Sequence, residues 1–164
     1  MLYNLGLLAG SRGDAAGARD MLARSVDIRR RAGREDETHI ALTFTAAVAV
    51  MTSDLEAART AMRESLQIGR RLGDRRLAWS LDVCACLAIA GGEPERGLRL
   101  AGAGSAMHEG SGVSPSAVWR SVVEAYLAPA REQLGQDAAR AADAAGRKLG
   151  YDDAIDYALD SLGT

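Results

Sequence analysis

Residues 53–73 read SDLEAARTAMRESLQIGRRLG, and the same outline recurs at residues 13–33 and 92–112. Each copy opens on a turn-like pair that ends in an acid: Gly13-Asp14, Ser53-Asp54 and Gly92-Glu93. The fourth residue after each acid is small: Ala18, Ala58 and Gly97. The copies stand 40 and 39 residues apart, and a fixed period of about this size is typical of helical repeat proteins. The sequence therefore predicts three copies of one helical hairpin.

The chemistry at the repeated positions favours helices. An acid at a helix N-terminus accepts hydrogen bonds from free amides, and a glycine after the last turn adopts a left-handed φ at little cost. The expected helices cover about residues 1–11, 14–32, 36–52, 54–72, 75–91 and 93–110. A further helix should begin at Ser114-Pro115 and kink or break near Pro129. Another at about 136–148 and a last one capped by Asp152 should follow.

Composition points to the same fold class. The 164 residues suffice for one domain with its own core, and aromatic residues make up only 4% of them, which favours an all-α fold over a sheet. The formal net charge of −2 gives no overall field that would attract nucleic acid or an anionic membrane surface. The sequence has no apolar run of membrane-spanning length and no charged-then-apolar leader. We therefore expect a cytoplasmic protein that binds neither nucleic acid nor membranes.

The first copy resembles the tetratricopeptide repeat, whose Leu-Gly, Gly-Asp and Ala signature corresponds here to Leu5-Gly6, Gly13-Asp14 and Ala18. The later copies carry Thr45-Ala46 and Cys84-Ala85 where that family has Leu-Gly. The resemblance implies an α-α superhelix, a tetratricopeptide-like solenoid of about three helical hairpins followed by C-terminal helices. We expect the hairpins over residues 1–112, and the C-terminal helices packed on the solenoid over residues 113–164.

A second resemblance covers roughly residues 75–162. It is carried by short stretches of common residues: Arg99-Leu100-Ala101-Gly102-Ala103, Gly112, Ala117 to Tyr126, Leu134-Gly135, Asp152-Asp153-Ala154 and Ala158-Leu159. These are similar to the repeat region that ends actinobacterial signalling regulators, the AfsR-like and LuxR-type ATPase-linked transcription factors. In that family, as the resemblance implies, a DNA-binding domain and a nucleotide-hydrolysing module precede the repeats, which sense or dock a partner. No Gly-x-x-x-x-Gly-Lys-Ser/Thr stretch is present in this sequence.

The tetratricopeptide resemblance also implies where a partner binds. In that family the first helix of each pair lines a concave groove, and the matching positions here are Tyr3, Leu7, Thr43, Ala47, Val50, Asp82, Cys86 and Ile89. These residues are mostly apolar, which suits an amphipathic helix from a protein partner, from a second copy in a homodimer, or from this chain's own C-terminal helices. The predicted function is a non-enzymatic protein-interaction or sensor module of a bacterial signalling or transcriptional regulator.

The residues that could carry chemistry form no recognisable catalytic or metal-binding motif. His108-Glu109 lacks the second histidine that a helical zinc site requires, and the run from Gly102 to Ser105 follows helical residues, not the strand of a phosphate loop. We expect no cofactor and no metal. The alternative function is a small-ligand-binding or enzymatic helical domain with a pocket near Asp82 and Cys86, to which folding would also bring His108.

Overall fold

The computed structural model describes residues 14–112 and 114–163, and the secondary structure of these residues is entirely α-helical. Its elements are α2 (Ala15–Arg31), α3 (Glu35–Met51), α4 (Leu55–Leu72), α5 (Leu77–Ala90), α6 (Pro94–Ser111), α7 (Ala117–Leu134), α8 (Gln136–Arg147) and α9 (Tyr151–Ser161). The helix predicted over residues 1–11 lies outside the described residues. The all-α fold is confirmed, with neighbouring helices packed as hairpins in a repeat-like arrangement.

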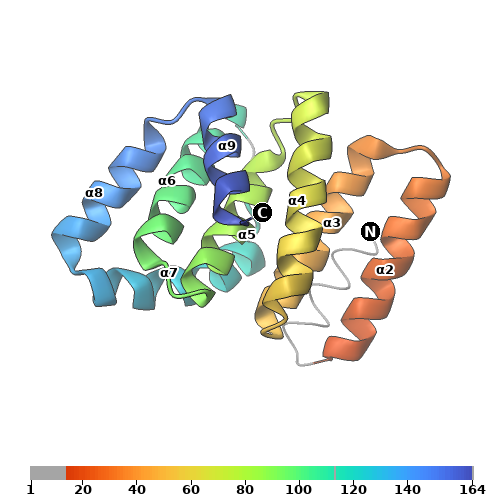
Figure 1. The fold of residues 1–164 in the computed structure, drawn as a ribbon, viewed down its shortest axis with the longest axis horizontal. Coiled ribbons are helices and arrows are strands. Elements are labelled where there is room, and N and C mark those ends of the chain that lie inside the picture. Colours follow the sequence, from red (N-terminus) through yellow and green to blue (C-terminus); the bar gives the residue numbers. More distant parts are fainter. Residues whose placement is uncertain (1–13, 113, 164) are drawn as a thin grey trace. The chain divides into compact units, whose positions relative to one another are not determined.

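The chain divides into two compact units, Met1–Asp74 and Arg75–Thr164. The boundary falls between the second and third predicted hairpins, so the grouping of all three hairpins into one solenoid over residues 1–112 stays a prediction. In the first unit, α3 packs against both α2 and α4 (Figure 1). The side chains of Leu22, Met62 and Leu66 are fully buried in this unit.

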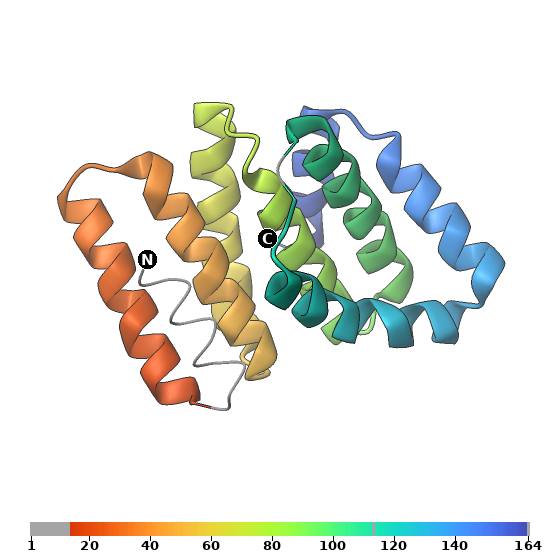
Figure 2. The ribbon, with the colours of Figure 1, turned by 180° about the vertical axis from the view of Figure 1, so that it is seen from behind.

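In the second unit, α5 and α6 form a hairpin that the C-terminal helices contact. Helix α7 lies against both α5 and α6 and then leads into α8, as the view from behind shows (Figure 2). Helix α8 packs along α6, and α9 contacts both α5 and α6. Leu81, Leu100 and Ile155 are fully buried here. The C-terminal helices are thus built into the same core as the α5–α6 hairpin.

The predicted turn chemistry explains where several helices begin and end. Asp14 and Asp54 cap α2 and α4, accepting hydrogen bonds from the amides of Gly17 and Ala57. The glycines at the ends of the three copies all have positive φ: Gly33, Gly73 and Gly112. This confirms the prediction that the end of each copy needs a left-handed residue.

Two predicted caps in the C-terminal part were wrong, and no break occurs at Pro129. Helix α7 is capped by Ser116, whose side chain accepts from the amide of Trp119, and not by Ser114. It continues through Pro129 to Leu134 without a break, although Pro129 has no amide proton to donate within the helix. The N-cap of α9 is Gly150, so Asp152 lies inside its first turn.

Glycines allow unusually close helix crossings in the second unit. A Cβ atom on Gly97 would lie 2.8 Å from the carbonyl oxygen of Ala85, which agrees with the small residues predicted on both helices of a hairpin. A Cβ on Gly102 would lie 2.3 Å from the carbonyl oxygen of Asp143, and one on Gly146 only 1.8 Å from that of Arg99. Helices α6 and α8 therefore meet backbone to backbone at two points.

Candidate functional site

The eight positions that the resemblance assigns to a groove fall into three groups. Tyr3 and Leu7 lie outside the described residues. The other six lie on α3 in the first unit and on α5 in the second: Thr43, Ala47 and Val50, then Asp82, Cys86 and Ile89. All of these six are buried except Ile89, which is partly exposed. Because each unit is described by itself, a groove common to both sets stays a prediction.

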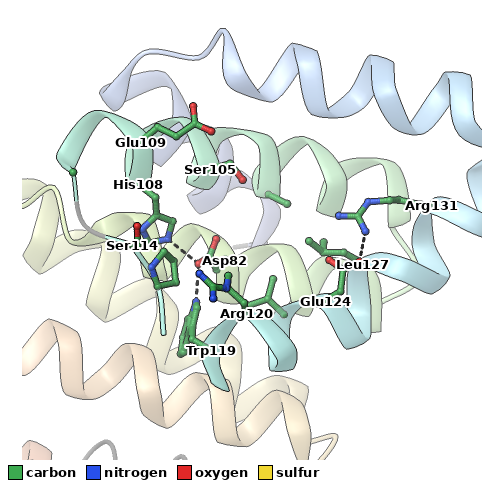
Figure 3. Close-up of a pocket in the computed structure, with 14 residues that line it drawn as sticks. Asp82, Ser105, His108, Glu109, Ser114, Trp119, Arg120, Glu124, Leu127 and Arg131 are labelled. Carbon is green, nitrogen blue, oxygen red and sulfur yellow. Dashed lines mark hydrogen bonds and ion pairs between the residues drawn. The ribbon is translucent and has the colours of Figure 1, made fainter. Parts of the chain in front are cut away.

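Asp82 is the centre of a hydrogen-bond cluster in the second unit. Its Oδ2 atom accepts a hydrogen bond from the indole Nε1 of Trp119 at 2.7 Å and lies 2.9 Å from Nε2 of His108 (Figure 3). The three side chains come from α5, α7 and α6, so one carboxylate joins three helices. Asp82 is only 7% exposed, and a carboxylate with so little access to water needs such donors.

The imidazole of His108 is held from a second side. Its ring centroid lies 6.4 Å from that of Trp79, with the two ring planes tilted by 49°. The main-chain carbonyl of His108 also accepts a hydrogen bond from the hydroxyl of Ser111. His108 thus has a fixed orientation beside Asp82.

The equivalent position one repeat earlier carries two hydroxyls. Thr43 precedes Asp82 by 39 residues, and Ser65 precedes Gly104 by the same distance. In the α3–α4 hairpin, Thr43 Oγ1 and Ser65 Oγ are buried and 2.8 Å apart. In the α5–α6 hairpin, a Cβ on Gly104 would lie 2.7 Å from Oδ1 of Asp82. The missing side chain of Gly104 therefore makes room for the larger carboxylate.

A pocket of about 540 Å³ opens beside this cluster, between α5, α6 and α7. Its volume lies in the range of small-molecule sites, which combine an apolar lining with a few fixed polar groups. Asp82, His108 and Trp119 supply the fixed polar groups. The apolar part of the lining is Ala101, Pro115, Val123 and Leu127.

Most charged groups around the pocket are already neutralised by a partner. The carboxylate of Glu109 binds Nη1 of Arg147 at 3.0 Å. The carboxylate of Glu124 binds the guanidinium of Arg131, as Figure 3 shows. Arg120 also lines the pocket and makes no ion pair with any described residue. Arg120 is thus the one arginine of the lining that has no carboxylate partner among the described residues.

Both cysteines are buried, and their surroundings make the two thiols unreactive. Burial, and after it the negative charge of Asp82, raises the pKa of the Cys84 thiol to about 12. Burial, and then the same carboxylate, also raise the pKa of Cys86 far above its ordinary value. A thiol in this state is protonated at neutral pH and is a poor nucleophile. Asp82 and His108 converge as the alternative function requires, but Cys86 does not line the pocket that they form.

No match comes from protein-family models, curated proteins or solved structures. Within residues 14–112 and 114–163, no helix is both long and apolar enough to cross a membrane. The same residues contain no group of three or more His, Cys, Asp and Glu side chains arranged to hold a metal ion.

Sequence reasoning missed the role of Trp119. Its indole lies 37 residues from Asp82 along the chain, and no motif in the sequence assigns a partner to its N–H group. One signal was available, because a buried tryptophan usually needs a hydrogen-bond acceptor. Asp82, the one acid among the predicted groove residues, was the available acceptor.

Proposed function

We propose that this chain is a non-enzymatic sensor module of a bacterial signalling or transcriptional regulator, and that its second unit binds a small molecule in the pocket beside Asp82. The observation that carries the proposal is the oriented Asp82–His108–Trp119 cluster at the edge of a pocket of about 540 Å³. Fixed polar groups next to an apolar lining give a site both affinity and selectivity.

Binding without turnover is favoured by what surrounds the Asp82–His108 pair. Such a pair orients a histidine as a general base, but nucleophilic catalysis also requires a hydroxyl or thiol within hydrogen-bond reach of the ring. Ser105 and Ser114 line the same pocket, yet neither hydroxyl hydrogen-bonds to His108 within the described part of the chain. Both thiols have strongly raised pKa values.

The resemblance to the repeat region of actinobacterial regulators supports the regulatory part of the proposal. A sensor passes its signal to another protein surface, so the proposal includes a protein partner or a second copy of the chain, in the cytoplasm. A ligand that binds one arrangement of the α5–α6–α7 helices better than another would shift the population that the partner meets. No step of this scheme requires direct contact with nucleic acid or with a membrane.

The test is a ligand-detected NMR screen of the full chain against a library of small fragments. Val123→Trp places a large ring on a partly exposed position that lines the pocket on α7, whereas Val118→Trp adds the same ring at a position of α7 that is 48% exposed and outside the lining. We expect some fragments to bind the wild-type protein and the Val118→Trp variant but not the Val123→Trp variant. Fragments that bind all three proteins equally would contradict the proposed site.

The same samples separate binding from catalysis. Each fragment that binds is incubated with the protein and followed by NMR for a day. Unchanged ligand spectra are expected. Conversion of a ligand that stops in His108→Gln would show instead that the Asp82–His108 pair acts as a catalytic base.

A further inference from the structure

A second pocket, of about 500 Å³, lies on another face of α6 in the second unit. Residues from α6, α8 and α9 line it, together with Leu134 at the end of α7. Its charged and aromatic side chains are Arg96, Arg99 and Tyr157, together with the carboxylates of Glu93 and Glu95. None of these residues lines the pocket beside Asp82.

Arg99 is an incompletely satisfied cation in this pocket. Its guanidinium carbon lies 4.6 Å from the centroid of the Tyr157 ring, and its Nε atom is buried without a hydrogen-bond partner. No carboxylate of the described residues pairs with it. A buried donor without an acceptor costs about 1–3 kcal/mol, so folded proteins rarely keep one without a reason.

The contact with Tyr157 does not satisfy the hydrogen-bond donors of Arg99. A cation–π contact is an attraction between the positive charge and the ring, and it gives no N–H group a carboxylate acceptor. The Arg99 guanidinium can therefore still bind a carboxylate or phosphate through its N–H groups while it lies beside the Tyr157 ring.

Arg96 is a second arginine beside the Tyr157 ring. Its guanidinium carbon lies 5.8 Å from the Tyr157 centroid, and its Nε lies 3.2 Å from a carboxylate oxygen of Glu93. Glu95 also lines the pocket, but its side chain is exposed and makes no ion pair with the described residues. Arg96 is thus compensated locally by Glu93, whereas Arg99 is not.

We propose that this pocket is an oxyanion-binding site in which Arg99 holds a carboxylate or phosphate group of a small ligand. Tyr157 keeps the Arg99 guanidinium in place, and Arg96, whose charge is compensated by Glu93, lines the same pocket. Leu134, Ala141 and Ala145 form an apolar wall beside the charged group. The site shares no lining residue with the pocket beside Asp82, and the proposal does not rest on the function proposed for that pocket.

The experiment is a titration of the full chain, in which the Nε–Hε resonance of Arg99 is followed by NMR. Sodium phosphate and sodium hexanoate are the probes, and sodium chloride at equal ionic strength is the reference. We expect a saturable shift with at least one probe and none with chloride. Arg99→Gln should abolish binding, and Arg99→Lys, which keeps the charge but loses the fork, should weaken it about tenfold. Arg140→Gln, an exposed arginine of α8 outside this pocket, is the matched control and should bind as the wild type does.

The outcomes also separate the two sources of the oxyanion. If hexanoate binds more tightly, the ligand is a carboxylate whose apolar chain lies along the apolar wall. If phosphate binds more tightly, the ligand carries a phosphoryl group. The proposal is overturned if neither probe shifts Arg99 beyond the chloride reference, or if Arg99→Gln binds as well as the wild type. It is also overturned if Arg99→Gln lowers the melting temperature while neither anion raises that of the wild type, because Arg99 would then be purely structural.

Discussion

Asp82 occupies the space that the absent side chain of Gly104 leaves open, since a Cβ on Gly104 would lie 2.7 Å from Oδ1 of Asp82. The first prediction follows from this contact. Gly104→Ala should push the carboxylate away from Trp119 and His108 and lower the free energy of unfolding by about 1–3 kcal/mol in urea denaturation. Gly110→Ala, in the same helix with nothing within 4 Å of the added carbon, should be neutral or stabilising by up to about 1 kcal/mol.

The earlier hairpin supplies a second test of the same contact. Asp82→Thr combined with Gly104→Ser recreates the Thr43–Ser65 pair of the α3–α4 hairpin. The double variant should be more stable than the sum of the two single changes predicts. Strict additivity, or a Gly104→Ala protein as stable as the wild type, would mean that Gly104 does not position Asp82.

Gly146→Ala should detach α8 from α6. The added Cβ would lie 1.8 Å from the carbonyl oxygen of Arg99, and a backbone atom cannot rotate out of the way as a side chain can. We expect a loss of about 3 kcal/mol in the free energy of unfolding, at the upper end for overpacking. Ala144→Leu, at an exposed position of α8, should change it little and serves as the control. Equal stability of the two variants would disprove the backbone contact.

Ala58→Leu tests the hairpin of the first unit. Ala58 is fully buried on α4, so three added carbon atoms have no space against α3 and should cost roughly 1–3 kcal/mol. Ala57→Leu adds the same atoms at an exposed position one residue earlier and should melt at nearly the wild-type temperature. An Ala58→Leu protein with unchanged melting would count against the repeat assignment.

The thiols should be almost unreactive until the protein unfolds. With a pKa near 12 in place of 9.0, Cys84 has about a thousandfold less thiolate at pH 8 than a model thiol, and its reaction with a disulfide reagent should slow accordingly. Both cysteines should react at the ordinary rate in denaturant. Rapid reaction of the folded protein would contradict the buried, protonated state of both thiols.

The same pKa shift predicts how stability depends on pH. The folded protein keeps the Cys84 proton up to pH values near 12, whereas the unfolded chain loses it near 9.0. The folded state therefore binds more protons between these values, and the free energy of unfolding should fall as the pH rises from 9 toward 12. Cys84→Ala should show a shallower decline over this window, measured by urea denaturation at several pH values.

The hairpins were predictable from the sequence because their signals are local. In α4, the N-cap is Asp54 and the C-cap is Gly73, and both act within a single turn. The spacing from Asp54 also places the small residue Ala58 at a fully buried position of the helix. The absence of a break at Pro129 has a tertiary cause. Proline weakens a helix interior, but Leu127 and Ala130 are buried on either side of it, and their packing keeps α7 continuous.

The site was harder to predict because its members are distant in sequence. Asp82 could be identified as an unusual acid on a mostly apolar helix, and its convergence with His108 was among the hypotheses. The packing of α7 against α5 and α6, which brings Trp119 to the same carboxylate, depends on tertiary contacts that no periodic pattern reveals. Arg99 gave no signal at all, since an arginine on an amphipathic helix is ordinarily solvated.

The crossing of α6 and α8 through Gly102 and Gly146 affects how a bound ligand would be felt elsewhere in the second unit. Most helix pairs are separated by side chains whose rotamers absorb small displacements, but here two main chains touch directly. Helices α6 and α8 should therefore move together as one rigid body. Helix α6 carries His108 near one end and Arg99 nearer the other. A displacement of α6 caused by a ligand at either pocket should therefore also move the residues of the other pocket.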